Sequence, residues 1–208
     1  MMRLFQAMAG AAKGGAETYF VNLALAFKRA GVDQRLAIRW NPARSAALQA
    51  GGLKPLELRF GGALDFFTRP ALRRALGEYK PHLVLSWMSR ASAMVPPGPY
   101  AHIGRLGGYY DLKYFRHCQH LVANTRDIAR HCRDGGWAEH RVHYVPNFVS
   151  WSPRPAEPRG RHGTPEGAPL LLALGRLHRN KAFDVLLAAL AQLPQAWLWL
   201  AGEGPEQA

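Results

Sequence analysis

The sequence predicts an α/β protein with one complete N-terminal Rossmann-like domain and the first β-α-β unit of a second. Strand-length apolar segments alternate with amphipathic helices over about 145 residues, which is typical of a parallel sheet covered on both faces. A segment dense in proline, glycine and arginine follows, and then another β-α-β pattern. We therefore predict a first domain over residues 1–150, a linker over 151–169 and an incomplete second domain over 170–208.

The first domain is expected to begin with a buried strand at Arg3–Met8, followed by a loop of small residues at Ala9–Gly15. A helix is predicted over Ala16–Ala30, where Gly31 can stop it. Four apolar residues in this segment recur at i, i+3, i+4 and i+7 and form one stripe: Phe20, Leu23, Ala24 and Phe27. Such a stripe packs a helix against a sheet.

The rest of the first domain continues the same alternation. A loop containing Pro42 is predicted between the second and third strands, and a helix over Pro70–Tyr79. Thr125 is expected to cap the next helix, which Gly135 and Gly136 close. The predicted strands after the first are Gln34–Trp40, Leu53–Phe60, His82–Met88, His102–Leu106, His120–Asn124 and Arg141–Val145.

The second domain is predicted to contain a strand at Leu170–Leu177, a helix at Ala182–Leu193 and a strand at Ala196–Ala201. One β-α-β unit cannot bury both faces of its sheet. We therefore expect the domain to continue beyond Ala208, or a partner to cover it.

The 27 Lys and Arg residues against 14 Asp and Glu give a net charge of +13, which favours anionic partners. The basic residues are scattered and lack interleaved aromatics, so nucleic acid is not expected as a partner, whereas an anionic membrane surface is a candidate. The alternative explanation for the positive charge is an arginine-rich composition that serves no binding surface. No apolar stretch reaches the roughly 18 residues that span a bilayer. We expect a cytoplasmic protein, peripheral on the inner membrane face at most, with Cys118 and Cys132 as core residues.

Two strand-to-helix loops can carry chemistry. Gly14 and Gly15 lie between the first strand and the first helix, where open parallel sheets bind ligands and glycines allow close approach to phosphate. A tight turn explains the two glycines equally well. In the second domain Gly175 and Arg176 close a strand, and Lys181 precedes a helix, so both cations can converge on one anion. A solvated basic loop is the alternative.

The order of these motifs resembles that of the GT-B fold, retaining glycosyltransferases of family 4, over essentially the whole chain. The matching segments are Gly14-Gly15-Ala16-Glu17, Val145-Pro146-Asn147, Gly175-Arg176-Leu177 with Lys181, Asp184-Val185-Leu186 and Gly202-Glu203-Gly204-Pro205. The chain departs from the family where Trp87 or Met88 replaces a histidine near the transferred sugar. Phe148-Val149-Ser150 replaces the usual Gly-Val-Asp, and the acidic pair of the family does not occur within 208 residues.

The resemblance implies that Gly14 and Gly15 lie near donor and acceptor and that Arg176 and Lys181 hold the donor diphosphate, acting as the catalytic cations. Gly175 and Gly202 are expected in the same nucleotide-sugar site. Fixed cations stabilise the charge that develops on a leaving phosphate, so no metal and no cofactor is expected beyond the nucleotide-diphosphate sugar itself. Asp111 could serve as a base, but an aspartate before a helical stretch is more often an N-cap.

These observations lead to three hypotheses about function. The favoured one is transfer of a sugar, with retention, to a membrane-associated glycan or lipid acceptor of lipopolysaccharide or cell-envelope type. The alternative is a non-catalytic fragment that only binds acceptor or membrane. A sugar-nucleotide epimerase is the weakest of the three.

Overall fold

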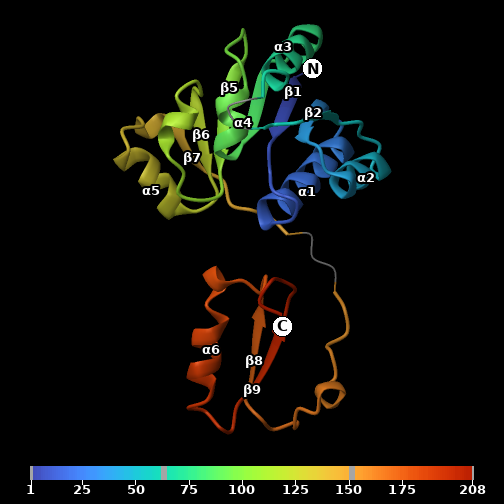
Figure 1. Ribbon diagram of the computed structural model, residues 1–208, viewed down its shortest axis with the longest axis vertical. Coiled ribbons are helices and arrows are strands. Elements are labelled where there is room, and N and C mark those ends of the chain that lie inside the picture. Colours follow the sequence, from blue (N-terminus) through green and yellow to red (C-terminus); the bar gives the residue numbers. More distant parts are fainter. Residues whose placement is uncertain (1, 62–64, 150–152, 208) are drawn as a thin grey trace. The chain divides into compact units, whose positions relative to one another are not determined.

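The computed structural model describes residues 2–61, 65–149 and 153–207. The chain divides into two compact units, Met1–Val149 and Ser150–Ala208. Each unit has a parallel sheet of its own, and the larger of the two sheets belongs to the first unit (Figure 1).

A parallel sheet of seven strands forms the centre of the first unit, in the order β3-β2-β1-β4-β5-β6-β7 (Figure 1). The strand order reverses between the neighbours β1 and β4, and such a switch point is where open α/β sheets bind ligands. The strands are β1 (Arg3–Met8), β2 (Asp33–Arg39), β3 (Leu56–Leu58), β4 (Leu83–Trp87), β5 (Ala101–Leu106), β6 (His120–Ala123) and β7 (Val142–Tyr144).

Helices cover both faces of this sheet, as the alternating pattern predicted. Successive side chains of β1 point to opposite faces, so Phe5 packs in one apolar cluster with Leu72, and Met8 packs in another with Phe20. The helices are α1 (Gly15–Arg29), α2 (Pro42–Ala50), α3 (Thr68–Tyr79), α4 (Met88–Met94) and α5 (Arg126–Asp134), with short 3-10 turns η1 (Leu112–Phe115) and η2 (Glu139–Arg141). Cys118 and Cys132 are buried and not bonded to each other, as expected of core residues.

Helix α2 replaces the loop that the sequence predicted around Pro42, so that prediction was wrong. Asn41 caps the helix, because its Oδ1 accepts the backbone N–H of Arg44 at 2.9 Å, and proline suits the first turn. The strand predicted over Leu53–Phe60 shrinks to β3, Leu56–Leu58. The strand predicted to end at Met88 ends at Trp87, because Met88 already begins α4.

The second unit contains the predicted β-α-β arrangement in shortened form. Strands β8 (Leu170–Leu174) and β9 (Trp197–Ala201) pair in parallel, and helix α6 (Phe183–Leu190) connects them along the chain. The unit also contains the 3-10 turns η3 (Arg159–His162) and η4 (Arg179–Lys181). Thr164 is buried and its hydroxyl accepts a hydrogen bond from the Trp199 indole at 2.9 Å. Part of the predicted linker therefore packs against β9.

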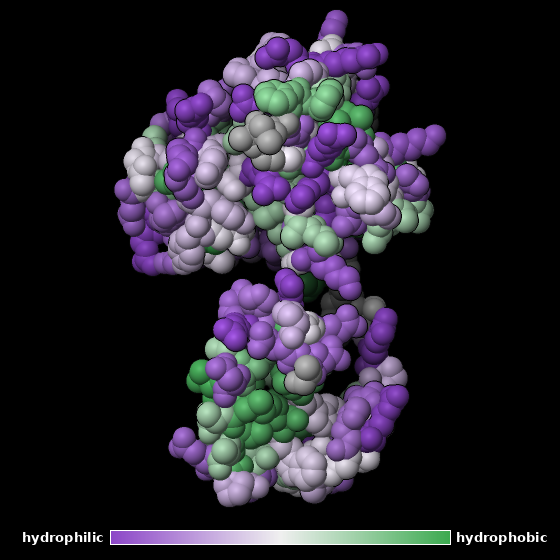
Figure 2. All heavy atoms as spheres, in the orientation of Figure 1, coloured by the Kyte–Doolittle hydropathy of each residue, from purple (hydrophilic) through white to green (hydrophobic). Residues whose placement is uncertain are grey.

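Apolar side chains gather on one face of the second unit (Figure 2). Leu172 and Leu174 of β8 are 62% and 70% exposed, and Val185 of α6 is 63% exposed. A soluble domain seldom leaves so much contiguous apolar surface in water. The described part of this unit thus presents a surface on which further strands or helices could pack.

Candidate functional site

The carboxyl ends of β1, β2 and β3 meet at one edge of the parallel sheet and enclose an open groove of about 710 Å³. The loop of residues 10–12 after β1 forms one side of the groove. Arg39, Trp40 and Asn41 at the end of β2, and Arg59 after β3, form the other. Trp40 is 68% exposed, which is unusual for so large an apolar side chain. An exposed indole beside two guanidinium groups can bind a sugar ring that carries negative charge.

Glu17, in the first turn of α1, fixes the conformation of the glycine loop. Its side chain is only 8% exposed, and its Oε1 accepts the backbone N–H of Ala11 at 2.7 Å. A Cβ atom on Gly10 or Gly14 would come within 3.0 Å of the Glu17 carboxylate, whereas a Cβ on Gly15 would meet no atom within 4 Å. A side chain at Gly14 would therefore displace the buried carboxylate, whereas a side chain at Gly15 would not.

Two side chains from the start of α2 hold the outer part of the same loop. Arg44 is buried, and its Nη2 donates to the carbonyl of Ala11 at 2.5 Å. Burial lowers the pKa of Arg44, while the nearby Glu17 carboxylate raises it. Asn41 donates from Nδ2 to the carbonyl of Ala12 at 3.2 Å. The loop is thus a wall braced by side chains, and the Ala11 amide is already engaged rather than open to a phosphate.

Arg105 is a buried cation at this edge that the sequence analysis did not single out. It is 5% exposed, its guanidinium lies 4.8 Å from the ring centre of Tyr19 and 5.2 Å from that of Trp87, and its Nη2 donates to Asn147 Oδ1 at 2.6 Å. Burial lowers its pKa. Within the part of the chain that the structure describes, no salt bridge compensates this charge.

A charge inside the apolar strand Ala101–Leu106 was the signal that could have identified Arg105. A buried charge without an ionic partner is costly, and such groups cluster at functional sites.

Trp87 and Met88 occupy the place where the family resemblance led us to look for a histidine. Trp87 is buried, and its Nε1 donates to Gln6 Oε1 at 3.1 Å. Met88 adopts a φ of 61°, which is uncommon for a residue with a side chain. Such strained backbone conformations often occur at ligand sites. Neither residue can replace the proton chemistry of an imidazole.

Asp111, the alternative base, acts as a cap. Its Oδ1 accepts the backbone N–H of Lys113 at 3.0 Å at the start of η1. Among residues 2–61, 65–149 and 153–207, no group of three His, Cys, Asp or Glu side chains is placed to hold a metal ion. In the same ranges no helix combines the length and apolar character that crossing a membrane requires.

In the second unit the predicted site residues lie on two neighbouring segments. Arg176 and Lys181 lie between the end of β8 and the start of α6, and Lys181 is exposed. The segments after β8 and β9 run side by side, because Gly175 donates its N–H to Ala201 O at 3.0 Å. A Cβ atom on Gly202 would collide with the carbonyl oxygen of Gly175. Close backbone packing therefore places Gly202 against Gly175, which lies on the segment that carries both cations.

A parallel Rossmann-like domain followed by a second β-α-β unit is the arrangement found in GT-B glycosyltransferases. The sequence profile described as Glycosyltransferase Family 4 matches residues 13–152. The chain is 34% identical over 205 residues to the lipopolysaccharide core biosynthesis glycosyltransferase LpsD of Rhizobium meliloti, covering 94% of this chain and 57% of LpsD. It is 35% identical over 199 residues to LpsE of the same organism, covering 93% and 58%.

The solved structures agree on the fold. Anabaena HepE, crystallised in complex with UDP, superimposes with a TM-score of 0.76 at 16% identity, covering 98% of this chain and 61% of HepE. The chain belongs to glycosyltransferase family 4. It spans a little less than three fifths of the length of the two curated relatives.

Proposed function

We propose that this chain supplies the acceptor-binding domain and the diphosphate-binding loop of a glycosyltransferase. The reaction would move a sugar from a nucleotide-diphosphate donor, with retention, to a glycan or lipid-linked acceptor of lipopolysaccharide or cell-envelope type. The observation that carries the proposal is the groove beside Trp40 at the carboxyl ends of the strands, in a chain that shares a third of its residues with lipopolysaccharide core glycosyltransferases.

The first unit suits an acceptor in this reaction. A sugar ring can stack on the exposed indole of Trp40, while Arg39 and Arg59 attract the negative charge that phosphates or carboxylates give to envelope glycans. The braced loop at Gly14 would keep this wall fixed when substrate binds. A rigid wall costs little ordering entropy on binding, which favours affinity and correct placement of the attacking hydroxyl.

The second unit suits the donor diphosphate. Cleavage of a sugar-phosphate bond moves negative charge onto the leaving diphosphate, and cations that strengthen their hold as the charge grows lower the barrier. Arg176 and Lys181 have this role in the proposal, and the chemistry then needs no protein base if the leaving phosphate takes the proton of the acceptor hydroxyl. No metal or cofactor is part of the proposed reaction.

Transfer assays test the roles of these cations. The assay uses a chimera in which residues 1–208 are joined to the remaining part of LpsD that this chain does not cover. We expect Arg176→Ala or Lys181→Ala to cost about 3 kcal/mol of transition-state stabilisation, roughly a hundredfold in kcat/KM. Arg179→Ala is the matched control, because Arg179 is an exposed cation of the same loop. Turnover within twofold of the parent for either variant refutes its assignment.

The stereochemistry and the acceptor are tested separately. Proton NMR of the product gives the anomeric configuration, and inversion would refute the retaining mechanism. Arg39→Gln and Arg59→Gln should raise the KM for an anionic acceptor and leave the KM for the donor unchanged. We also propose a cytoplasmic location with peripheral membrane association, and sedimentation with anionic vesicles tests that association.

The alternative is a non-catalytic fragment that binds only acceptor or membrane. Calorimetric titration of the 208-residue chain with nucleotide-diphosphate sugars distinguishes the two, because micromolar binding contradicts this alternative.

A further inference from the structure

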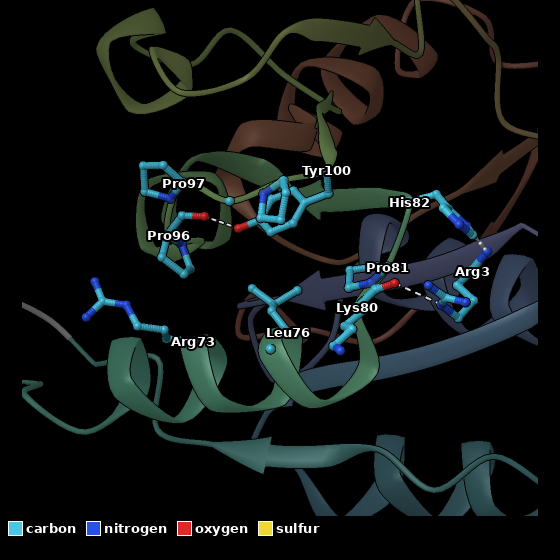
Figure 3. Close-up of a pocket in the computed structure, with 12 residues that line it drawn as sticks. Arg3, Arg73, Leu76, Lys80, Pro81, His82, Pro96, Pro97 and Tyr100 are labelled. Atoms are coloured by element: carbon cyan, nitrogen blue, oxygen red, sulfur yellow. Dashed lines mark hydrogen bonds between the residues drawn. The ribbon is translucent and has the colours of Figure 1, made fainter.

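A second cavity, of about 470 Å³, lies at the opposite edge of the sheet in the first unit (Figure 3). It is enclosed by Arg3 at the start of β1, by the last turn of α3 with Pro81 and His82, and by residues 96–100 before β5. These are the amino ends of the strands, whereas the groove beside Trp40 lies at the carboxyl ends. The proposed transfer reaction therefore makes no use of this cavity.

The long walls of the cavity are apolar and rigid. Figure 3 shows Pro96, Pro97 and Tyr100 along one side and Leu76 of α3 along the other. The Tyr100 hydroxyl donates to the carbonyl of Pro96, and burial raises the pKa of Tyr100 to about 12, so the phenol stays neutral. Prolines fix their own φ angles, so the wall loses little entropy when a ligand binds.

Cations flank these apolar walls. Figure 3 shows the guanidinium-bearing Arg73 toward one end and the cations Arg3 and Lys80 toward the other, where the imidazole of His82 also lies. Arg3 is held in place, because its Nε donates to the Lys80 carbonyl at 2.8 Å and its backbone N–H donates to His82 Nδ1 at 2.9 Å. That arrangement leaves the terminal nitrogens of Arg3 as donors for a ligand. None of the twelve described residues that line the cavity is acidic.

Gly77 leaves open space in the wall of the cavity. It lies inside α3 and lines the cavity, and a Cβ atom at this position would meet no atom within 4 Å. Glycine inside a helix costs about 1 kcal/mol relative to alanine. The chain thus carries a destabilising residue at a position that lines the cavity and has open space for a larger side chain.

We propose that this cavity binds a small amphiphilic anion, an apolar chain or ring that carries a phosphate or a carboxylate. The apolar part lies between Leu76 and Tyr100, and the anionic group pairs with Arg3 and Lys80 at their end of the cavity. A volume of about 470 Å³ is within the range of pockets that enclose small molecules. The site is independent of the transfer reaction and of its donor and acceptor.

Calorimetry on the 208-residue chain tests this proposal with octyl phosphate, octanoate, octyl glucoside and inorganic phosphate, each below its micellar concentration. We expect octyl phosphate and octanoate to bind at least tenfold more tightly than octyl glucoside or inorganic phosphate. Equal binding of octyl glucoside would show that the cations are not used, and equal binding of inorganic phosphate would show that the apolar walls are not used. Either result overturns the proposal.

Two variants and one control locate the site. Gly77→Leu should abolish octyl phosphate binding and raise the melting temperature, because the side chain fills the cavity and favours the helix. Lys80→Gln should weaken binding about tenfold, because it removes one of the two cations that pair with the anion. Arg74→Gln should have no effect, because Arg74 does not line the cavity and pairs with Glu78 at 2.8 Å. Unchanged binding by a folded Gly77→Leu protein overturns the proposal.

The source of the anion is distinguished by vesicles of phosphatidylglycerol. If the parent chain sediments with these vesicles and the Gly77→Leu variant does not, the ligand is a lipid headgroup with its acyl chain. If octyl phosphate binds and the vesicles do not, the ligand is a free amphiphile.

Discussion

Substitution of the two adjacent glycines by alanine should give opposite effects on stability. At Gly14 the new Cβ would lie within 3.0 Å of the Glu17 carboxylate, where ordinary van der Waals contact begins at 3.4 Å. The carboxylate would have to move by about 1 Å, which breaks its hydrogen bond to the Ala11 amide and overpacks the site. These two effects together cost about 2 to 3 kcal/mol.

At Gly15 the new methyl group meets open space at the first residue of α1, so helix propensity alone acts and stabilises by up to about 1 kcal/mol. The two variants should therefore differ by about 3 kcal/mol in the free energy of unfolding. For a unit of this size that difference corresponds to roughly 6 to 12 °C in melting temperature. Urea unfolding followed by circular dichroism measures the difference directly.

A double-mutant cycle isolates the contact. Glu17→Ala removes the carboxylate, so the further change Gly14→Ala should then cost less than about 0.5 kcal/mol, and the coupling energy should be about 2 kcal/mol. The reasoning is refuted if Gly14→Ala is as stable as Gly15→Ala, or if the cost of Gly14→Ala is the same with and without Glu17.

Three further predictions concern other parts of the chain. Burial lowers the pKa of His102 to about 4, so the unfolded state takes up a proton before the folded state as the pH falls. The free energy of unfolding, measured by urea titration, should reach its maximum above pH 6.5 and be about 2 kcal/mol lower at pH 5. His102→Gln should remove most of this pH dependence. Thr125→Ala should destabilise by about 1 kcal/mol in the same assay, because the hydroxyl accepts the Ile128 amide at 3.1 Å. Gly202→Ala should separate the segments after β8 and β9, and loss of amide hydrogen-exchange protection at Gly175 would report it; unchanged protection would contradict the packing.

The arrangement of strands and helices was largely predictable because it depends on local periodicity. The strand Arg3–Met8 and the Thr125 cap were found correctly, since each is encoded by a few neighbouring residues. Helix α2 was missed because its Ala-rich segment lacks a strong apolar stripe, and the cap that starts it depends on the orientation of Asn41. The short helix α4 was missed because its first residue, Met88, adopts a φ that no sequence pattern favours there.

The candidate site was predictable in position and less so in chemistry. The rule that parallel strands present their loops at one edge directed attention to Gly14, but a sequence cannot show that the side chain of Glu17 occupies the space beside it. Trp40 and Arg59 lie 19 residues apart in the chain and line one groove only because β2 and β3 pair.

The fold class, the family resemblance and the loops in which ligands are expected could all be obtained from the sequence, because they depend on periodicity and on the spacing of glycines and cations. Which of those residues are braced, buried or open emerged only from the folded chain. Tertiary packing brought Arg105 against Tyr19 and Trp87, and it joined Arg3, Gly77 and Tyr100 around one cavity. Burial and close contact arise between segments distant in the chain, and local patterns carry no record of which segments meet.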